Sequence, residues 1–178
     1  MPTLDVWSNS ITTSLRDLLT SALACSLLRN RWESTRPVYI CSPWITDFTV
    51  FDNRYGQFDV LIPAMRGSSK IRFGDVLLAL SAESEIRIIS KETEATKQFL
   101  AQRNFPTSNV FARMADESLH EKGLLTPDFY LEGSMNLTYS GVNLNREKVS
   151  YHAGTDRPVV ERMAAAYAEL NRRWQQLR

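Results

Sequence analysis

The spacing of apolar and polar residues divides the chain into helical and extended segments. Residues 10–29 repeat apolar side chains at helical spacing, from Ile11 through Leu15 and Leu18 to Cys25, which predicts an amphipathic helix. The same spacing predicts helices over 73–83, 92–104 and 156–177. Short runs of β-branched and aromatic residues predict buried strands over 37–44, 84–91, 109–115 and 148–153.

The order of these segments indicates an α/β fold. Strands alternate with helices early in the chain and a hairpin follows over 118–136, so we expect a mixed β-sheet flanked by helices. The length of 178 residues suits a single domain over 1–178, with 1–35 as an N-terminal helical segment packed on it. Between 52 and 72 the sequence predicts a loop, a short helix and a Gly-Ser-Ser turn.

Composition and charge narrow the classes of function. The formal net charge is only +1, so a nucleic-acid surface would be a local patch rather than a field over the whole molecule. Cys25 and Cys41 lie in apolar runs without metal-ligand spacing, so we expect two buried thiols and no metal site. The sequence shows no secretory leader, and no apolar run approaches the roughly 18 residues of a membrane span. These features predict a soluble cytoplasmic protein that does not contact a membrane.

The segment 118–136, SLHEKGLLTPDFYLEGSMN, contains two alternating runs that meet at a Pro-Asp turn signal. The length of the turn decides which side chains share a face of this hairpin. A three-residue loop separates the apolar from the polar side chains, and it places Lys122 opposite Glu132 and His120 opposite Ser134. A two-residue loop would mix the two sets, so burial on one side favours the three-residue loop.

The polar face of this hairpin would combine an imidazole, an ammonium, a hydroxyl and an amide, from His120, Lys122, Ser134 and Asn136. Such a set suits a phosphate, because the lysine supplies a positive charge and the serine and asparagine supply neutral donors. The histidine can attack phosphorus or transfer a proton near neutral pH. The alternative is a solvated strand face with an ordinary surface histidine, and the spacing alone leaves both interpretations open.

The run HEKGLLTPDFYLEGSMN, residues 120–136, resembles the signature of the phospholipase D superfamily, in which His-x-Lys is followed by Asp and then by Gly-Ser-x-Asn. The segments VYICSPWITD and EIRIISK are similar to the first two sheet strands of such domains. Glu147 stands eleven residues beyond Asn136, where single-motif nucleases of this superfamily carry a glutamate that braces the histidine. The resemblance covers most of residues 36–152 and implies a phospholipase D-like fold.

The motif departs from the usual pattern at two positions. The family aspartate normally stands five residues after the lysine, where this chain has Pro127, and Asp128 follows one residue later. The hairpin is therefore one residue shorter than usual, and the displaced aspartate weakens the expectation of activity. Glu132, opposite Lys122 in the expected register, either holds the ammonium in place or competes with phosphate for it.

The resemblance implies metal-independent cleavage of a phosphodiester through a phosphohistidine intermediate, without a cofactor. Two copies of the motif are needed, one histidine as nucleophile and one as general acid, and this chain carries one copy. His152 has no second motif after it, so a symmetric homodimer would supply the other His120. In that scheme Lys122 and Asn136 bind the phosphate. Ser134 supports it and Glu147 orients the histidine.

Compact single-motif members of the superfamily are mostly nucleases, so the resemblance favours nucleic acid as substrate, and DNA over RNA. The candidate contacts are basic residues, each of which also fits an ordinary solvated charge: Arg66, Lys70, Arg72, Lys91 and Arg113. The alternative is a catalytically weak or inactive subunit that holds nucleic acid for partner proteins of a bacterial DNA-modification or defence system. The displaced Asp128 and the position of Glu132 favour that alternative.

Overall fold

The computed structural model describes residues 3–7, 14–29, 36–102, 105 and 109–177. Its centre is a seven-stranded sheet whose strands are β1 (Thr3–Trp7), β2 (Val38–Cys41), β5 (Ile86–Lys91), β6 (Val110–Ala115), β7 (Gly123–Leu125), β8 (Phe129–Gly133) and β9 (Lys148–Ala153). Their order across the sheet is β1-β9-β8-β7-β2-β5-β6. Strands β2, β5 and β6 run parallel, and the other neighbouring pairs are antiparallel, so the sheet is mixed as expected.

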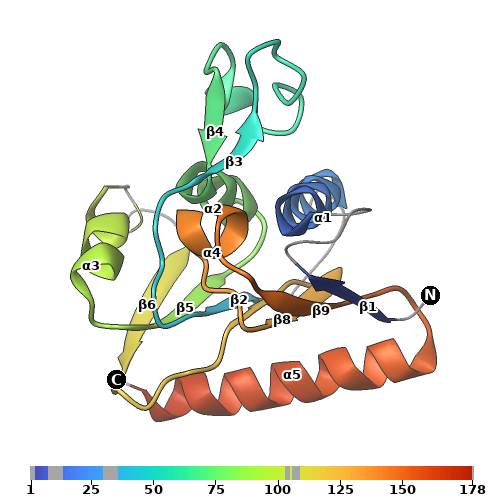
Figure 1. The fold of residues 1–178 in the computed structure, drawn as a ribbon, viewed down its shortest axis with the longest axis vertical. Coiled ribbons are helices and arrows are strands. Elements are labelled where there is room, and N and C mark those ends of the chain that lie inside the picture. The colour runs from blue at the N-terminus through green and yellow to red at the C-terminus, as the bar shows by residue number, and fades with distance from the viewer. Residues whose placement is uncertain (1–2, 8–13, 30–35, 103–104, 106–108, 178) are drawn as a thin grey trace.

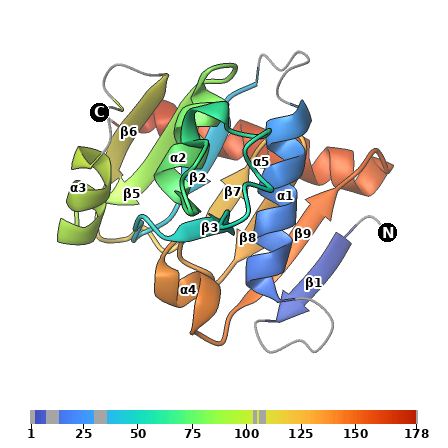
Figure 2. The same cartoon turned by 90° about the horizontal axis from the view of Figure 1, so that it is seen from above.

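Helices cover both faces of the sheet. They are α1 (Leu15–Arg29), α2 (Phe73–Ser81), α3 (Glu94–Ala101), α4 (Tyr139–Asn143) and α5 (Arg157–Gln176). Figure 1 shows α5 alone along one face, with the other four helices on the opposite side. Figure 2 shows α1, α2 and α4 lying over the sheet. The buried apolar residues accordingly form two cores, a larger one against α1 and α2 and a smaller one against α5.

A two-stranded ribbon of β3 (Thr49–Asp52) and β4 (Lys70–Arg72) projects from the body on the side away from α5 (Figure 1). A 3₁₀ helix, Pro63–Met65, lies in the segment of sequence that connects the two strands. The sequence predicted this short helix and the turn after it, but it missed both strands. They are four and three residues long, which is too short for a period of two to stand out.

The main predicted elements are confirmed with shorter bounds, and the expected α/β class is confirmed with them. The first part of the helix expected over 10–29 lies outside the described residues. The strand expected over 37–44 already ends at Cys41, where Ser42 and Pro43 follow. The segment 1–35 was expected to be helical, but it also contains β1, which pairs with β9. Cys25, expected to be buried, is exposed.

The expected register of the hairpin is wrong by one residue. In the structure Leu124 pairs with Leu131 and Leu125 pairs with Tyr130, and the Thr126 N–H donates to the Phe129 carbonyl at 2.8 Å. The loop therefore has two residues. Both faces of the hairpin are buried, since Leu124 and Leu131 belong to the larger core and Leu125 and Tyr130 to the smaller one. A hairpin covered on both faces has no polar side, so alternation could not determine its register.

Candidate functional site

Gly133, at the end of β8, has a backbone conformation that other residues rarely adopt. Its φ angle is +152°, and a Cβ placed there would lie 2.8 Å from the Cα of Val149 and closer still to the carbonyl oxygen of Lys148. Only glycine lets β8 approach β9 this closely. The close approach places Ser134 against β9, where its N–H donates to the Lys148 carbonyl at 3.0 Å.

Ser134 connects the motif to Glu147. Its hydroxyl donates to one carboxylate oxygen of Glu147, and the side-chain amide of Asn145 donates to the other at 3.2 Å. Glu147 is buried, so these hydrogen bonds compensate for part of the cost of placing its carboxylate away from water. The structure therefore joins two of the predicted site residues, from segments 13 residues apart.

His120 and Lys122 form the second pair. The ammonium of Lys122 donates to the backbone carbonyl of His120 at 2.5 Å. The carbonyl of Lys122 accepts from the Gly133 N–H at 3.3 Å, which connects this pair to Ser134 and Glu147. The imidazole of His120 is exposed and receives no hydrogen bond from the part of the chain that the structure describes. Its expected contact with Glu147 stays a prediction.

Asn136 follows on the same loop. Its side-chain oxygen is buried, with no hydrogen-bond partner among the described residues. Its backbone carbonyl accepts from Thr138 at 2.9 Å, and a Cβ on Gly141 would collide with that carbonyl, so α4 packs tightly on the loop. Buried polar atoms without partners are rare in folded proteins. This one is an acceptor, so a phosphate could bind only through the NH₂ group of the same amide.

Two cavities border the His120–Lys122 pair. His120 lines one of about 340 Å³ with Arg173 and Leu177, and Lys122 lines one of about 430 Å³ with Glu132 and Arg162. Residues of α5 therefore contribute to both. Ser134, Asn136 and Glu147 are among the lining residues of neither.

Glu132 does not face Lys122, which corrects the expected register. It pairs with Gly123, and its carboxylate accepts hydrogen bonds from Arg162 and from the His152 ring, the latter at 2.9 Å. Burial raises the pKa of Glu132, whereas the hydrogen bond and charge of Arg162 and the contact with His152 lower it, and the net shift is downward.

His152 is buried within this network, near the end of β9. Its second ring nitrogen lies 3.1 Å from the hydroxyl of Thr3 on β1. Both ring nitrogens therefore have partners, and the residue connects β1 to β8 through β9. These contacts give His152 a structural role.

Asp128, the displaced motif residue, holds α1 on the hairpin. The Ser26 hydroxyl donates to its carboxylate at 2.9 Å, and Arg29 forms an ion pair with it at 3.2 Å. The shift of one residue therefore leaves the aspartate in a role that stabilises the fold.

The five predicted basic contacts lie in three places. Arg66, Lys70 and Arg72 are exposed on and beside the β3–β4 ribbon, which lies on the far side of the sheet from α5 (Figure 1). Arg113 donates to the Trp174 and Leu177 carbonyls and thereby caps the C-terminal end of α5.

Lys91 is buried at the end of β5 and lies 5.5 Å from the centroid of the Trp44 ring. Its ammonium is also 3.4 Å from Glu117. Trp44 itself was assigned to a buried strand from the sequence, but it is exposed beyond the end of β2. An indole directly after Ser-Pro, where the strand stops, was the signal that could have indicated this.

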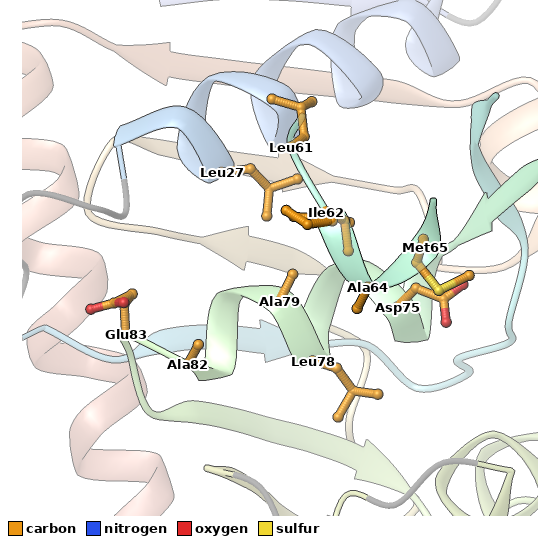
Figure 3. A pocket seen from close by; sticks show the side chains of 11 residues that line it. Leu27, Leu61, Ile62, Ala64, Met65, Asp75, Leu78, Ala79, Ala82 and Glu83 are labelled. Atoms are coloured by element: carbon orange, nitrogen blue, oxygen red, sulfur yellow. The ribbon is translucent and has the colours of Figure 1, made fainter. Parts of the chain in front are cut away.

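An apolar cavity of about 420 Å³ lies between α1, α2 and the segment around Pro63 (Figure 3). Aliphatic side chains such as Leu27, Ile62 and Leu78 line it, and Asp75 and Glu83 are the only charged residues among its described lining. That described lining supplies no cation for a phosphodiester. Within the described ranges there is no cluster of three histidine, cysteine or acidic side chains suited to a metal ion. No helix in the described part of the chain has the length and apolarity to cross a membrane.

Solved structures with a similar fold include that of Nuc from Salmonella typhimurium, described as a phospholipase D family member. The two share 16% sequence identity, the similarity covers 99% of this chain and 95% of Nuc, and the TM-score is 0.57. The chain has the phospholipase D fold. No protein-family model matches the sequence, and no curated protein matches it significantly.

Other solved structures that are similar to this chain belong to proteins with different roles. TrmBL2, an archaeal chromatin protein described as showing a novel mode of DNA binding, has a TM-score of 0.51 at 9% identity, and the similarity spans 53% of its length. A polyphosphate kinase from Porphyromonas gingivalis has a TM-score of 0.50 at 10% identity, with 26% of its length covered. The fold alone therefore does not decide the reaction, and the function has to be argued from the site.

Proposed function

We propose that the chain is a metal-independent phosphodiesterase that acts on nucleic acid, with DNA favoured over RNA, as a homodimeric endonuclease. The observation that carries the proposal is the connected motif on a phospholipase D fold. His120 and Lys122 lie together, Ser134 binds Glu147, and the Gly133 N–H on the Lys122 carbonyl connects the two pairs. These are the residues that the sequence resemblance assigns to phosphodiester cleavage.

In the proposed reaction the imidazole of His120 attacks phosphorus and forms a phosphohistidine, while the bond from phosphorus to the leaving oxygen breaks. A second histidine donates the proton that the leaving oxygen needs. That histidine then takes a proton from water, which attacks the phosphohistidine and releases the phosphate monoester. Lys122 and Asn136 stabilise the negative charge on the phosphate oxygens throughout.

The second histidine would come from another copy of the chain. His120 is exposed and its ring is not engaged by the described residues, so it is accessible to a partner subunit. A two-fold axis beside the hairpin would bring two such histidines together. A specific interface of this kind should bury at least roughly 1,000 Å² in total.

The alternative is an inactive nucleic-acid-binding subunit of a larger system, and the contacts of two motif residues favour the enzyme over it. Glu132 is bound to Arg162 and His152 and does not oppose Lys122. Asp128 is displaced in sequence but is engaged in holding α1. Neither departure from the motif removes a group that the proposed chemistry requires.

The test is cleavage of labelled DNA and RNA by the wild-type chain in excess EDTA, compared with His120→Ala. We expect wild-type cleavage and none by the variant, with nucleic-acid binding retained because Lys122 and Asn136 still hold phosphate. Lys122→Ala should weaken both binding and rate, because its charge acts on the ground state and the transition state alike. Full activity of His120→Ala would refute the mechanism, and binding without any cleavage by the wild type would favour the inactive subunit.

Two further measurements address the intermediate and the dimer. A phosphodiester substrate should leave an acid-labile, base-stable phosphoryl group on His120. A mixed dimer with one wild-type and one His120→Ala subunit should be nearly inactive, because each turnover needs both imidazoles. Retention of about half the activity would instead mean that each subunit works alone.

A further inference from the structure

Trp44 lies directly beside the motif asparagine. Ile45 forms a parallel bridge with Leu137, and the Thr46 N–H donates to the Leu137 carbonyl at 3.0 Å. Trp44 and Asn136 directly precede the two residues of this isolated bridge, so their backbones lie on neighbouring segments. Because successive side chains of an extended segment alternate, the buried Ile45 leaves Trp44 on the outer side, where it is exposed.

The backbone that carries Trp44 is fixed in place. The Ser42 hydroxyl donates to the Trp44 carbonyl at 2.8 Å and accepts from the Leu137 N–H at 3.2 Å. The Tyr139 N–H donates to the Thr46 hydroxyl at 3.2 Å. These bonds join the loop after β2 to the loop after β8, so the position of the indole relative to Asn136 does not depend on a free loop.

The Lys91 ammonium also lies over one face of the indole ring. The Lys91 ammonium lies 5.5 Å from the ring centroid, and the lysine side chain is only 7% exposed, whereas Trp44 is 43% exposed. One side of the ring therefore meets a buried charge while much of the side chain faces solvent. A rigid aromatic surface of this kind, near the amide that the proposed function assigns to the phosphate, is suited to stacking with a nucleobase.

We propose that Trp44 stacks an unpaired base next to the phosphate held at Asn136, and that this contact makes the chain selective for single-stranded nucleic acid. This inference rests on the proposed function. A base inside a duplex already stacks on both sides with its neighbours, so it cannot offer a face to the indole without leaving the helix. An unpaired base can stack on the indole directly. The contact does not depend on the sequence, because every base has an aromatic face.

The test measures equilibrium binding by fluorescence anisotropy, in the His120→Ala background so that the oligonucleotide stays intact. The probes are a labelled single strand and the same strand in a duplex. We expect tighter binding of the single strand, and a loss of about 5- to 150-fold on Trp44→Leu with little change for the duplex. Trp44→Phe should restore most of the affinity, because phenylalanine also stacks, which distinguishes stacking from a loss of local packing.

Phe111 provides a control. It is also an exposed aromatic residue. It lies on β6, at the edge of the sheet and four strand spacings from β8, which is roughly 19 Å. Phe111→Leu should leave binding of both probes unchanged, and an effect equal to that of Trp44→Leu would mean that the loss reflects general surface chemistry and would overturn the assignment.

An abasic site moved along the single strand locates the stacked base. When Trp44 is present, an abasic site at one position of the strand should lower the affinity. In the Trp44→Leu variant, an abasic site at that position should have no effect. Equal binding of single strand and duplex, or a Trp44→Leu variant that binds as tightly as its parent, would overturn the inference while nucleic-acid binding still supported the proposed function. If neither the His120→Ala parent nor any of its variants binds either probe, both this inference and the proposed function are overturned.

Discussion

Replacing Gly133 with alanine should strongly destabilise the fold, because two separate costs act at this position. The residue has φ of +152°, a conformation that costs a side-chain-bearing residue about 1–3 kcal/mol. The new Cβ would also lie 2.8 Å from the Val149 Cα, against an ordinary contact of 3.4–4 Å, and closer still to the Lys148 carbonyl. Backbone atoms must then move, which adds about 1–3 kcal/mol.

The sum, about 2–6 kcal/mol, is a large part of the roughly 5–15 kcal/mol that stabilises an ordinary domain. Urea unfolding followed by circular dichroism measures it directly. For a chain of 178 residues the melting temperature should fall by about 2–4 °C for each kcal/mol.

Gly154 separates the two costs. It has φ of +113°, but a Cβ there would meet nothing within 4 Å. Gly154→Ala should therefore lose only the conformational part, about 1–3 kcal/mol. If the two alanine variants lose equal stability, or if Gly133→Ala loses less than Gly154→Ala, the close approach of β8 to β9 does not constrain the motif glycine and the reasoning fails.

Three further results are expected. Asp128→Ala should lower the free energy of unfolding by about 1–2 kcal/mol in urea titrations, because α1 loses the hydrogen bond from Ser26, and cleavage should persist. Glu132→Gln should destabilise the chain at pH 7 but less at pH 4. The pKa of this carboxyl is lowered on folding, so its stabilising contribution is present above the unfolded value of 4.5 and is lost as the pH falls through the folded pKa. Hydrolysis should continue in excess EDTA, and a requirement for added magnesium would indicate different chemistry.

The sequence predicted the elements whose pattern is long or chemically distinct. The helix ending near residue 177 repeats apolar side chains over five turns, and the strand of residues 84–91 is a dense β-branched run, so both were identified. The strand β1 was missed because five residues with one buried side chain give little pattern. Residues 3–7 form a strand because they pair with the edge of β9. This pairing is a tertiary contact, which local sequence does not encode.

The family resemblance predicted that Ser134, Asn136 and Glu147 belong to one site, which stays a prediction. The structure places the Ser134 hydroxyl against the Glu147 carboxylate, a contact that the sequence did not predict. The register of the hairpin was not predictable, because helices cover both of its faces and remove the polar side. The partners of Glu132 lie on β9 and α5, at 20 and 30 residues along the chain, so no local rule could find them.

The pairing of β1 with β9 also has a consequence for how the chain acquires its structure. Thr3 and His152 are 149 residues apart, so this pair closes one of the longest possible loops and is expected to form late in folding. At a synthesis rate of about 5–20 residues per second, β9 leaves the ribosome roughly 7–30 s after β1. Until then β9, once made, presents an open edge to any other extended chain nearby. Yield during expression should therefore depend on how quickly this last strand docks.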